Sequence, residues 1–220
     1  MKRAVIIMAK VPRAGNVKTR LQPFLTPEQS ADFAECLMRD TIEKVKNLQN
    51  QLIIAYSPLK ERKFFDKFSL VETLFVEQKG INLGEKMFNA FEFAFGRNAD
   101  SAVMIGTDSP TFPVEFIERA FAHLEKSDAV LGKTSDGGFY LIGLRRLKME
   151  IFENVEWSSP QTFEQTKENI RRAGLKLKET PEWFDVDEPA DLEKLREDFA
   201  QNQDLRLIAP QTFEWMRSNL

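Results

Sequence analysis

Short apolar runs that alternate with amphipathic segments are the feature of this sequence that most constrains its fold. Continuous Val/Ile-rich runs of this kind are typical of strands that are buried on both faces of a sheet. Strands that alternate with helices predict a single three-layer α/β/α domain with a mostly parallel sheet. The predicted strands cover residues 2–8, 51–56, 73–76, 101–106, 129–132 and 139–144.

Helix-start signals lie between these runs. The segment Thr26-Pro27-Glu28-Gln29 combines an N-cap threonine, a proline at the first helical position and a glutamine at the third, which is a capping-box pattern. Asp187 is a candidate N-cap for a helix that begins at Pro189. Helices are predicted over 27–47, 82–95 and 113–125, after Ser159-Pro160, after Pro189, and in a last short segment, 210–220.

Length and composition limit the protein class. A chain of 220 residues usually forms one domain, and we expect a domain over 1–200 with a helical tail over 201–220. The single cysteine, Cys36, and the single histidine, His123, exclude an intramolecular disulfide and a multi-histidine zinc site. The 31 basic and 34 acidic residues give a net charge of -3, which argues against a nucleic-acid partner held by bulk charge. No apolar run approaches the roughly 18 residues of a membrane span, so we expect a cytoplasmic protein that does not bind membranes.

Basic residues crowd the connection that follows the first predicted strand. In doubly wound sheets, ligands bind where strands end and helices begin. The connection lacks both the P-loop spacing and the G-x-G-x-x-G fingerprint, but lysines, arginines and free amides there suit a polyphosphate. The alternative is a solvated surface loop. The candidate phosphate-binding residues are Lys10, Arg13, Gly15, Lys18 and Arg20.

Acidic residues follow two other predicted strands. Asp108 ends the run at 101–106, and Asp187 ends the segment 183–186, which reads as a short strand. Carboxylates in these places are suited to holding a Mg²⁺ ion that bridges substrate phosphates. The alternatives are a turn aspartate before Ser-Pro for Asp108 and the helix N-cap already named for Asp187.

Two further features point to a second ligand. The turn Asp136-Gly137-Gly138 lies between two predicted strands, where glycines allow a ligand to approach the backbone, although the same residues also simply favour a turn. Trp157 is a candidate pocket residue, with packing at a pocket rim as the alternative.

The motifs together resemble a known family. The stretches AKVPRAGNVKTRL, GINLGEKM, GTDSP, SDGGFYLIG, WSS and DVDEPADL occur in the order found in transferases associated with radical-SAM/selenodomain proteins, over about residues 1–195. That resemblance implies a GT-A fold like that of nucleotide-diphospho-sugar transferases. More distantly, the chain is similar to phospholactate guanylyltransferases and to molybdenum-cofactor nucleotidyltransferases.

The resemblance also implies roles for individual residues. It implies that Asp108 and Asp187 coordinate Mg²⁺ or Mn²⁺, and that the turn at Asp136 contacts the second substrate. The chain departs from the usual pattern at Lys133, where proline commonly stands, and this lysine is expected to add positive charge near the acceptor. Lys10, Arg13, Lys18 and Arg20 match the phosphate-binding loop, Gly80, Asn82 and Gly84 match the region near the nucleobase and ribose, and Asp136, Gly137 and Gly138 match the second-substrate turn.

Three functions follow from these features. The favoured one is nucleotidyl transfer from a nucleoside triphosphate to a small phosphorylated or hydroxylated acceptor, with Lys18 and Arg20 stabilising the leaving diphosphate. Four cations within eleven residues suit a triphosphate better than a diphosphate. The first alternative is glycosyl transfer from a nucleotide-diphospho-sugar, for which Asp136 is the candidate base. The second alternative is a nucleotide-binding partner protein without catalysis.

A protein contact is the last expectation from the sequence. Phe93 lies off the apolar arc of its predicted helix, and Phe213 and Trp215 make the C-terminal tail aromatic. These three residues favour a contact such as a homodimer.

Overall fold

A seven-stranded sheet forms the centre of the computed structural model, which describes residues 2–22, 24–48, 50–68 and 73–220. The strand order is β3-β2-β1-β4-β6-β5-β7, so the chain order reverses between the neighbouring strands β1 and β4. All pairings are parallel except those of β6, which runs antiparallel to both β4 and β5. The mostly parallel α/β prediction is therefore confirmed. The strands are β1 (Arg3–Lys10), β2 (Gln51–Ser57), β3 (Leu74–Glu77), β4 (Ser101–Ile105), β5 (Ala129–Lys133), β6 (Phe139–Leu144) and β7 (Leu177–Glu179).

The direction of β6 follows from the turn that precedes it. Gly137 adopts a φ of 91°, in the region that favours glycine, and its N–H donates to the carbonyl of Thr134 at 3.1 Å. This tight turn brings Lys133 opposite Phe139 and sends the chain back along β5. β5 and β6 are therefore a hairpin within an otherwise parallel sheet.

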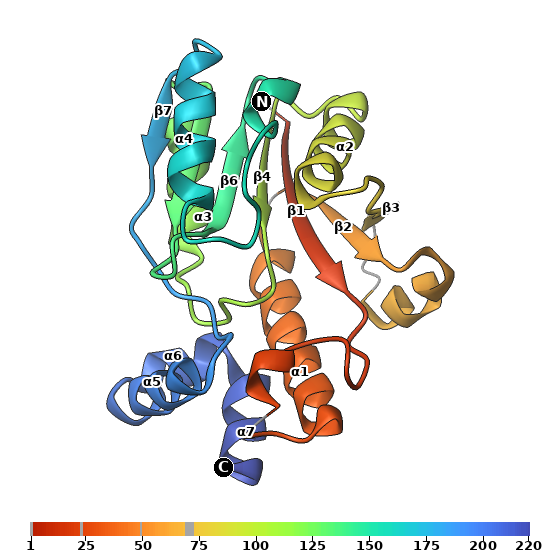
Figure 1. The fold of residues 1–220 in the computed structure, drawn as a ribbon, viewed down its shortest axis with the longest axis vertical. Coiled ribbons are helices and arrows are strands. Elements are labelled where there is room, and N and C mark those ends of the chain that lie inside the picture. Colours follow the sequence, from red (N-terminus) through yellow and green to blue (C-terminus); the bar gives the residue numbers. More distant parts are fainter. Residues whose placement is uncertain (1, 23, 49, 69–72) are drawn as a thin grey trace.

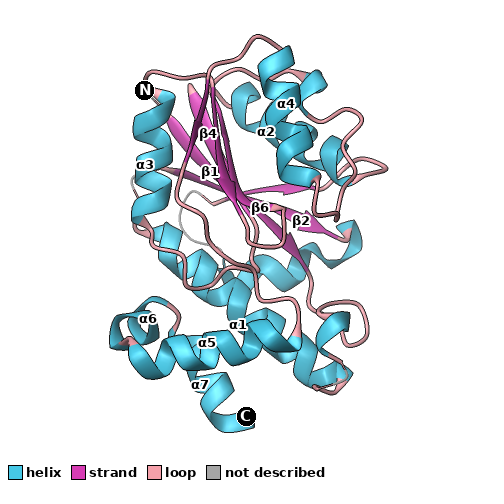
Figure 2. Ribbon diagram, turned by 60° about the vertical axis from the view of Figure 1, so that its left-hand side comes forward, coloured by secondary structure: helices cyan, strands magenta, loops and turns pink. Residues whose placement is uncertain are grey.

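Helices cover both faces of the sheet and one end of it (Figures 1 and 2). The expected capping box at Thr26 is present, because its hydroxyl accepts from the Gln29 amide while the Gln29 side chain accepts from the Thr26 amide. The helices are α1 (Pro27–Lys46), α2 (Leu83–Gly96), α3 (Glu115–Leu124), α4 (Thr162–Arg172), α5 (Pro189–Gln201), α6 (Gln203–Ile208) and α7 (Pro210–Asn219), with 3-10 turns η1 (Thr19–Leu21), η2 (Leu59–Phe68) and η3 (Met149–Ile151).

The alternation of side chains along the strands divides the core into two layers. On β1, Val5 and Ile7 pack with α1 and α3 on one face, while Ala4 and Ile6 pack with α2 and α4 on the other. All four of these side chains are fully or almost fully buried. The central strands therefore read as continuous apolar runs in the sequence because both faces are covered.

A third, smaller core lies beyond the sheet, where α5, α6 and α7 pack against the first half of α1 (Figure 2). The buried Asp40 carboxylate of α1 fixes α7, since it accepts from the amides of Gln211 at 3.0 Å and Thr212 at 2.8 Å. The aromatic residues of the tail are used within the chain, because Trp215 packs on Phe33 and Phe213 packs on Phe199, with ring centroids 4.9 and 5.4 Å apart. Phe93 likewise packs at the edge of the core beneath α2. The three aromatic residues that favoured a homodimer contact thus have partners inside the chain.

Two local expectations for the segment before α5 are wrong. Residues 183–186 do not form a strand, because only Trp183 makes a β-bridge, to Thr134. The N-cap of α5 is Glu188 rather than Asp187, and the Asp191 side chain accepts from the amides of both residues at 2.8 and 3.0 Å. The Asp187 side chain is therefore free of the capping role and available to the site described below.

None of the helices in the described part of the chain is long and apolar enough to cross a membrane. The longest, α1, has 20 residues and carries eight charged side chains.

Candidate functional site

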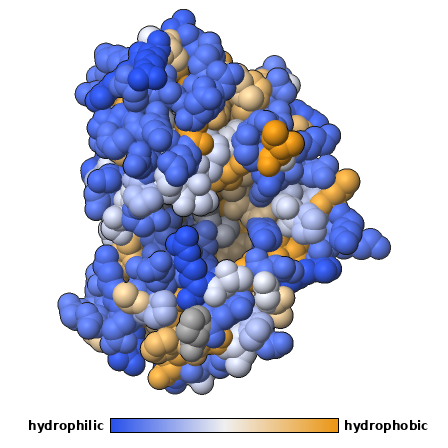
Figure 3. Space-filling view, viewed as in Figure 1, coloured by the Kyte–Doolittle hydropathy of each residue, from blue (hydrophilic) through white to orange (hydrophobic). Residues whose placement is uncertain are grey.

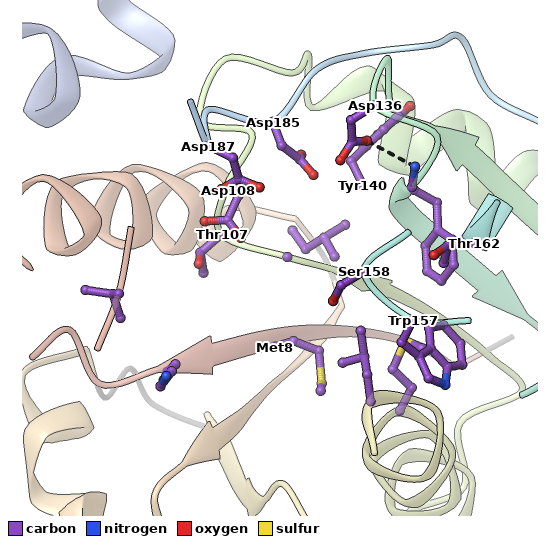
Figure 4. Close-up of a pocket in the computed structure, with 18 of the residues that line it drawn as sticks. Met8, Thr107, Asp108, Asp136, Tyr140, Trp157, Ser158, Thr162, Asp185 and Asp187 are labelled. Atoms are coloured by element: carbon purple, nitrogen blue, oxygen red, sulfur yellow. Dashed lines mark hydrogen bonds between the residues drawn. The ribbon is translucent and has the colours of Figure 1, made fainter. Parts of the chain in front are cut away.

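A cavity of about 680 Å³ opens at the carboxyl ends of β1 and β4. This is the point at which the strand order reverses, where ligands bind in open α/β sheets. Figure 3 shows a hollow in this face, with apolar surface inside it between hydrophilic parts of the molecule. Figure 4 shows the acidic residues 108, 185 and 187 on one side of the cavity and Trp157 and Ser158 on the other.

Lys18 links two of the predicted site residues. Its ammonium donates to the Asp108 carboxylate and, at 2.8 Å, to Asp187. The Lys18 side chain is only 5% exposed, whereas the two carboxylates are 45% and 39% exposed. Burial disfavours the charged form of Lys18, but the two carboxylates outweigh that effect and raise its pKa above the ordinary value. The structure thus brings Lys18, Asp108 and Asp187 together.

A backbone contact explains why the two carboxylates meet although 79 residues separate them. The Val186 amide donates to the Asp108 carbonyl at 2.9 Å, so the segment before α5 is held beside the end of β4. Val186 itself is fully buried in the third core. Packing of the C-terminal helices therefore positions Asp187 beside Asp108 at this edge of the sheet.

Asp185 is a site residue that the sequence reasoning missed. It lines the same cavity and accepts a hydrogen bond from the Ser109 hydroxyl. Burial, together with the nearby Asp108 carboxylate, raises the pKa of Asp185 to about 7. A period-of-two pattern could have revealed it, because residues 184 and 186 face the core and residues 185 and 187 line the cavity.

The basic connection after β1 divides into residues that line the cavity and one that does not. Lys10 and Arg20 line it together with Lys18. Lys10 donates to the Asn16 carbonyl at 2.8 Å, and Arg20 makes an exposed, 3.6 Å ion pair with Glu188. Arg13 does not line the cavity, because it pairs at 2.7 Å with Glu61 of η2. Gly15 lies in this connection with a φ of 78° and is not a lining residue either.

The predicted nucleobase region lies at the start of α2, with its glycines next to the cavity rather than in it. Asn82 caps α2 by accepting from the Glu85 amide at 2.9 Å. Gly80 has a φ of 136°, and a Cβ there would meet Glu85 at 2.6 Å. The residues of this region that do line the cavity are Gln78, Leu83 and Met87.

Gly84 has a different role, because it allows close contact between α2 and Trp157. A Cβ at Gly84 would lie 2.6 Å from the Trp157 ring and 2.8 Å from the Phe152 carbonyl. The Trp157 ring also meets Phe139 edge-on at 6.4 Å and lines the cavity. The tryptophan therefore belongs to the pocket wall as predicted.

The Asp136 turn forms part of the same wall. Asp136 and Gly138 line the cavity, while a Cβ at Gly137 would lie 2.1 Å from the Pro160 carbonyl oxygen, so only glycine fits there. The expected extra charge near the acceptor is not found, because Lys133 lies outside the cavity, where it pairs with Glu182 at 3.7 Å.

The acidic pair fits a divalent cation only in combination with a ligand. The two carboxylates converge on one point, which the Lys18 ammonium occupies here. Within the described ranges, no group of three or more His, Cys, Asp or Glu side chains is placed to hold a metal ion. Mg²⁺ commonly takes one or two carboxylates and completes its shell with water and substrate phosphates. Asp108 and Asp187 could therefore hold such an ion together with a phosphate ligand, once Lys18 has moved.

The fold and this site define an α/β protein of the nucleotide-diphospho-sugar transferase type. A protein from Desulfovibrio desulfuricans G20, proposed to be a nucleotide-diphospho-sugar transferase, shares 30% sequence identity and superposes with a TM-score of 0.87, over 100% of this chain and 99% of that one. The chain belongs to the family DUF2064, described as an uncharacterized protein conserved in bacteria, whose model matches residues 41–159. The link to radical-SAM/selenodomain proteins stays a prediction.

More distant structures share the fold alone. The CTP complex of CMP:2-keto-3-deoxy-manno-octonic acid synthetase matches 91% of this chain and 99% of its own at a TM-score of 0.59 and 14% identity. The manganese complex of Rv0371c from Mycobacterium tuberculosis H37Rv matches 90% of this chain and 99% of its own at a TM-score of 0.53 and 12% identity.

Proposed function

We propose that the protein is a divalent-cation-dependent transferase that takes a nucleotide-diphospho-sugar and transfers its sugar to a small-molecule acceptor. The distribution of positive charge around the cavity carries this choice. Of the four cations that favoured a triphosphate, Arg13 pairs with Glu61 outside the cavity, and Lys18 is bound to Asp108 and Asp187 until they release it. At most three cations can therefore reach a ligand, one fewer than the number on which the triphosphate argument rested. The 30% identical relative is proposed to be a nucleotide-diphospho-sugar transferase.

The reaction follows from the placement of the chain's own groups. The bond between the sugar carbon and the diphosphate oxygen breaks, the acceptor oxygen bonds to that carbon, and a nucleoside diphosphate leaves. A divalent cation, when bound, neutralises charge on the diphosphate. Lys10 and Arg20 bind phosphate oxygens. Asp108 and Asp187 would hold the cation, and the Lys18 ammonium, once released from these two carboxylates, would bind the diphosphate as well. Asp136, on the opposite wall, accepts the proton that the acceptor loses.

Nucleotidyl transfer is the second candidate, and the position of Lys18 favours it. Once released from the carboxylates, Lys18 would join Lys10 and Arg20 as a third lining cation, enough for a triphosphate. A cytidylyl-transferring synthetase that binds CTP has the same fold. In this reaction the acceptor attacks the α-phosphorus and diphosphate leaves.

A ligand panel with product analysis tests the proposal. Thermal unfolding is measured with UDP-, GDP-, ADP- and CDP-sugars and with the four ribonucleoside triphosphates, each with and without Mn²⁺ or Mg²⁺. A ligand at 100 times its Kd stabilises by about 2.7 kcal/mol, a rise in Tm of roughly 5–10 °C for a domain of this size. We expect a metal-dependent rise with a nucleotide-diphospho-sugar, and release of a nucleoside diphosphate when acceptors are added. A rise with a triphosphate alone, with diphosphate as product, would replace the proposal by nucleotidyl transfer. No rise with any ligand would overturn both.

A further inference from the structure

The charged residues that line the cavity are unevenly distributed between its two walls. In the part of the chain that the structure describes, all basic lining residues come from the stretch between the end of β1 and η1: Lys10, Lys18 and Arg20. The acidic residues Asp108, Asp185, Asp187 and Glu188 also line the cavity. The opposite wall consists of the β5–β6 turn, the start of β6 and the segment before α4. Among the described residues, the only charged lining residue on that wall is Asp136. Two lysines of this region do not line the cavity: Lys133 pairs with Glu182, and Lys167 pairs with Glu179 at 2.9 Å.

The Asp136 carboxylate is fixed, and no cation neutralises it. Its Oδ1 atom accepts from the Thr134 hydroxyl at 2.6 Å and from the Gly138 amide at 3.0 Å. Among the described residues it has no salt-bridge partner. Its negative charge therefore acts on whatever occupies this half of the cavity, and it would repel a phosphate or a carboxylate.

Three amides at the start of α4, which borders the same wall, are not free to bind a phosphate. Free amides in the first turn of a helix commonly bind anions. Here Gln161 donates to the Ser159 hydroxyl at 3.2 Å, Thr162 to the Ser159 carbonyl at 3.1 Å, and Phe163 to the Gly137 carbonyl at 2.9 Å.

The rest of this half combines apolar and aromatic side chains with the hydroxyl residues Ser158, Ser159 and Thr162. Trp157 and Phe139 form the side, and Met8, Met87 and Met104 line the cavity between them and β1 and β4. Figure 4 shows Met8 and Trp157 among the side chains that line the cavity. A flat tryptophan ring beside a carboxylate suits a ligand that has an apolar face and either no charge or a positive charge.

From these observations we infer that the acceptor is a hydroxyl-bearing small molecule with an apolar face and no negative charge, held between Trp157 and Asp136. The same wall disfavours phosphorylated and carboxylated acceptors. The inference rests on the proposed function only in assigning the basic half of the cavity to the donor.

Three probes of similar size that differ in the charge of one substituent test the inference. They are 4-(hydroxymethyl)benzylamine, 4-methylbenzyl alcohol and 4-(hydroxymethyl)benzoate, which share a ring and a hydroxymethyl group. Inorganic diphosphate with Mg²⁺ is added to fill the basic half of the cavity, and binding is measured by ligand-observed NMR at probe concentrations on the order of millimolar, where fragments of this size bind. We expect the amine to bind roughly tenfold more tightly than the benzoate, with the neutral alcohol between them.

Two variants test whether Asp136 causes the preference for the amine over the benzoate. Asp136→Asn should reduce the preference for the amine over the benzoate by about threefold to fivefold, the size expected of an exposed ion pair. Glu182→Gln removes a carboxylate from the outer side of the same region and should leave the preference unchanged. Equal thermal unfolding of the variants and the wild type confirms that the fold is intact.

The outcomes separate this inference from the proposed function. Tighter binding of the benzoate, a preference that survives Asp136→Asn, or no binding of any probe would overturn the acceptor assignment. The probes are tested with inorganic diphosphate instead of a nucleotide, so the two claims can fail separately. If the protein bound no nucleotide-diphospho-sugar but preferred the amine as expected, the proposed donor would be overturned and the inferred acceptor class would be supported.

Discussion

The two walls of the cavity differ in how their charged groups are held. In the β1–η1 connection, long basic side chains form ion pairs with residues distant in the sequence. Arg13 pairs with Glu61, and Lys18 pairs with Asp108 and Asp187. On the opposite wall, the short Asp136 side chain is fixed by hydrogen bonds from its own turn. A short side chain stays where the backbone puts it, whereas a lysine or arginine can extend to a distant counter-ion. Sequence position therefore predicts the place of an aspartate better than that of an arginine.

The largest effect should come from removing Lys18. We expect Lys18→Met to reduce transfer activity by at least about 100-fold, because a charge next to the diphosphate is worth several kcal/mol. The affinity for Mn²⁺ without nucleotide should rise by about tenfold in the same variant, because the ammonium no longer occupies the point between the carboxylates. A coupled assay measures the transfer activity, and a Mn²⁺ titration measures the affinity for the cation.

Lys133→Met is the matched control, since Lys133 also pairs with a carboxylate but lies outside the cavity. It should change neither quantity. Unchanged Mn²⁺ affinity in Lys18→Met would contradict the assigned position of the cation.

The packing of the aromatic wall gives the next effect. Gly84→Ala would place a Cβ 2.6 Å from the Trp157 ring, so we expect a loss of about 1–3 kcal/mol in the free energy of unfolding. Gly96→Ala, in the same helix, meets no atom within 4 Å and should change stability by less than about 1 kcal/mol. Urea denaturation measures both. Equal stability of the two variants would show that Trp157 does not pack as described.

Asp185 gives a pH-dependent effect on the acidic side. Burial raises its pKa to about 7, so the folded protein binds this proton more tightly than the unfolded chain does. Its contribution to stability is therefore greatest below the ordinary pKa of about 4 and is lost as the pH rises toward 7. Asp185→Asn should remove this dependence and stabilise the protein at pH 8 by about 1–2 kcal/mol, once solvent screening is allowed for.

Urea denaturation at about pH 4.5 and about pH 8 measures how the free energy of unfolding of the wild type and of Asp185→Asn depends on pH. Asp32→Asn, at an exposed site on α1, is the control and should leave the pH dependence as it is. If the stability of the wild type changed between these pH values by the same amount as that of Asp185→Asn, the raised pKa of Asp185 would be contradicted.

The smallest effect distinguishes the two arginines. Arg20→Gln should weaken binding of the donor by roughly fivefold, since a partly screened ion contact is lost. Arg13→Gln should change it by less than about twofold, because Arg13 already pairs with Glu61. Isothermal titration compares them. If Arg13→Gln lost more donor affinity than Arg20→Gln, Arg13 would contact the donor, and the four cations would again favour a triphosphate as the donor.

Much of the fold was predictable from local signals. The six predicted strands correspond to β1–β6, and the capping box at Thr26 marks the start of α1. Both were predictable because apolar runs and helix caps are formed by residues adjacent in the sequence. Strand β7 was missed, since Leu177–Glu179 is short and mostly exposed and has no apolar alternation. The segment 183–187 was misread, because its alternation reflects a core on one side and the cavity on the other rather than a place in the sheet.

The candidate site was predictable only in part. Asp108, Asp136 and Trp157 lie at the predicted edge because strand ends and turns place them there. The Lys18 bridge, the Arg13–Glu61 pair and the contact between Gly84 and Trp157 join residues far apart in the chain. Such pairings depend on tertiary packing, which a single sequence does not reveal.

Titration of Mn²⁺ tests the central claim most directly. Binding is followed by electron paramagnetic resonance in the wild type and in Asp187→Asn, with and without the nucleotide-diphospho-sugars of the panel. We expect weak binding to the wild type alone, because Lys18 occupies the site, and tight binding when the matching nucleotide is present. Asp187→Asn should lose the nucleotide-dependent increase. Binding that is equal with and without every nucleotide, or that survives in Asp187→Asn, would contradict a shared site for the cation and the donor.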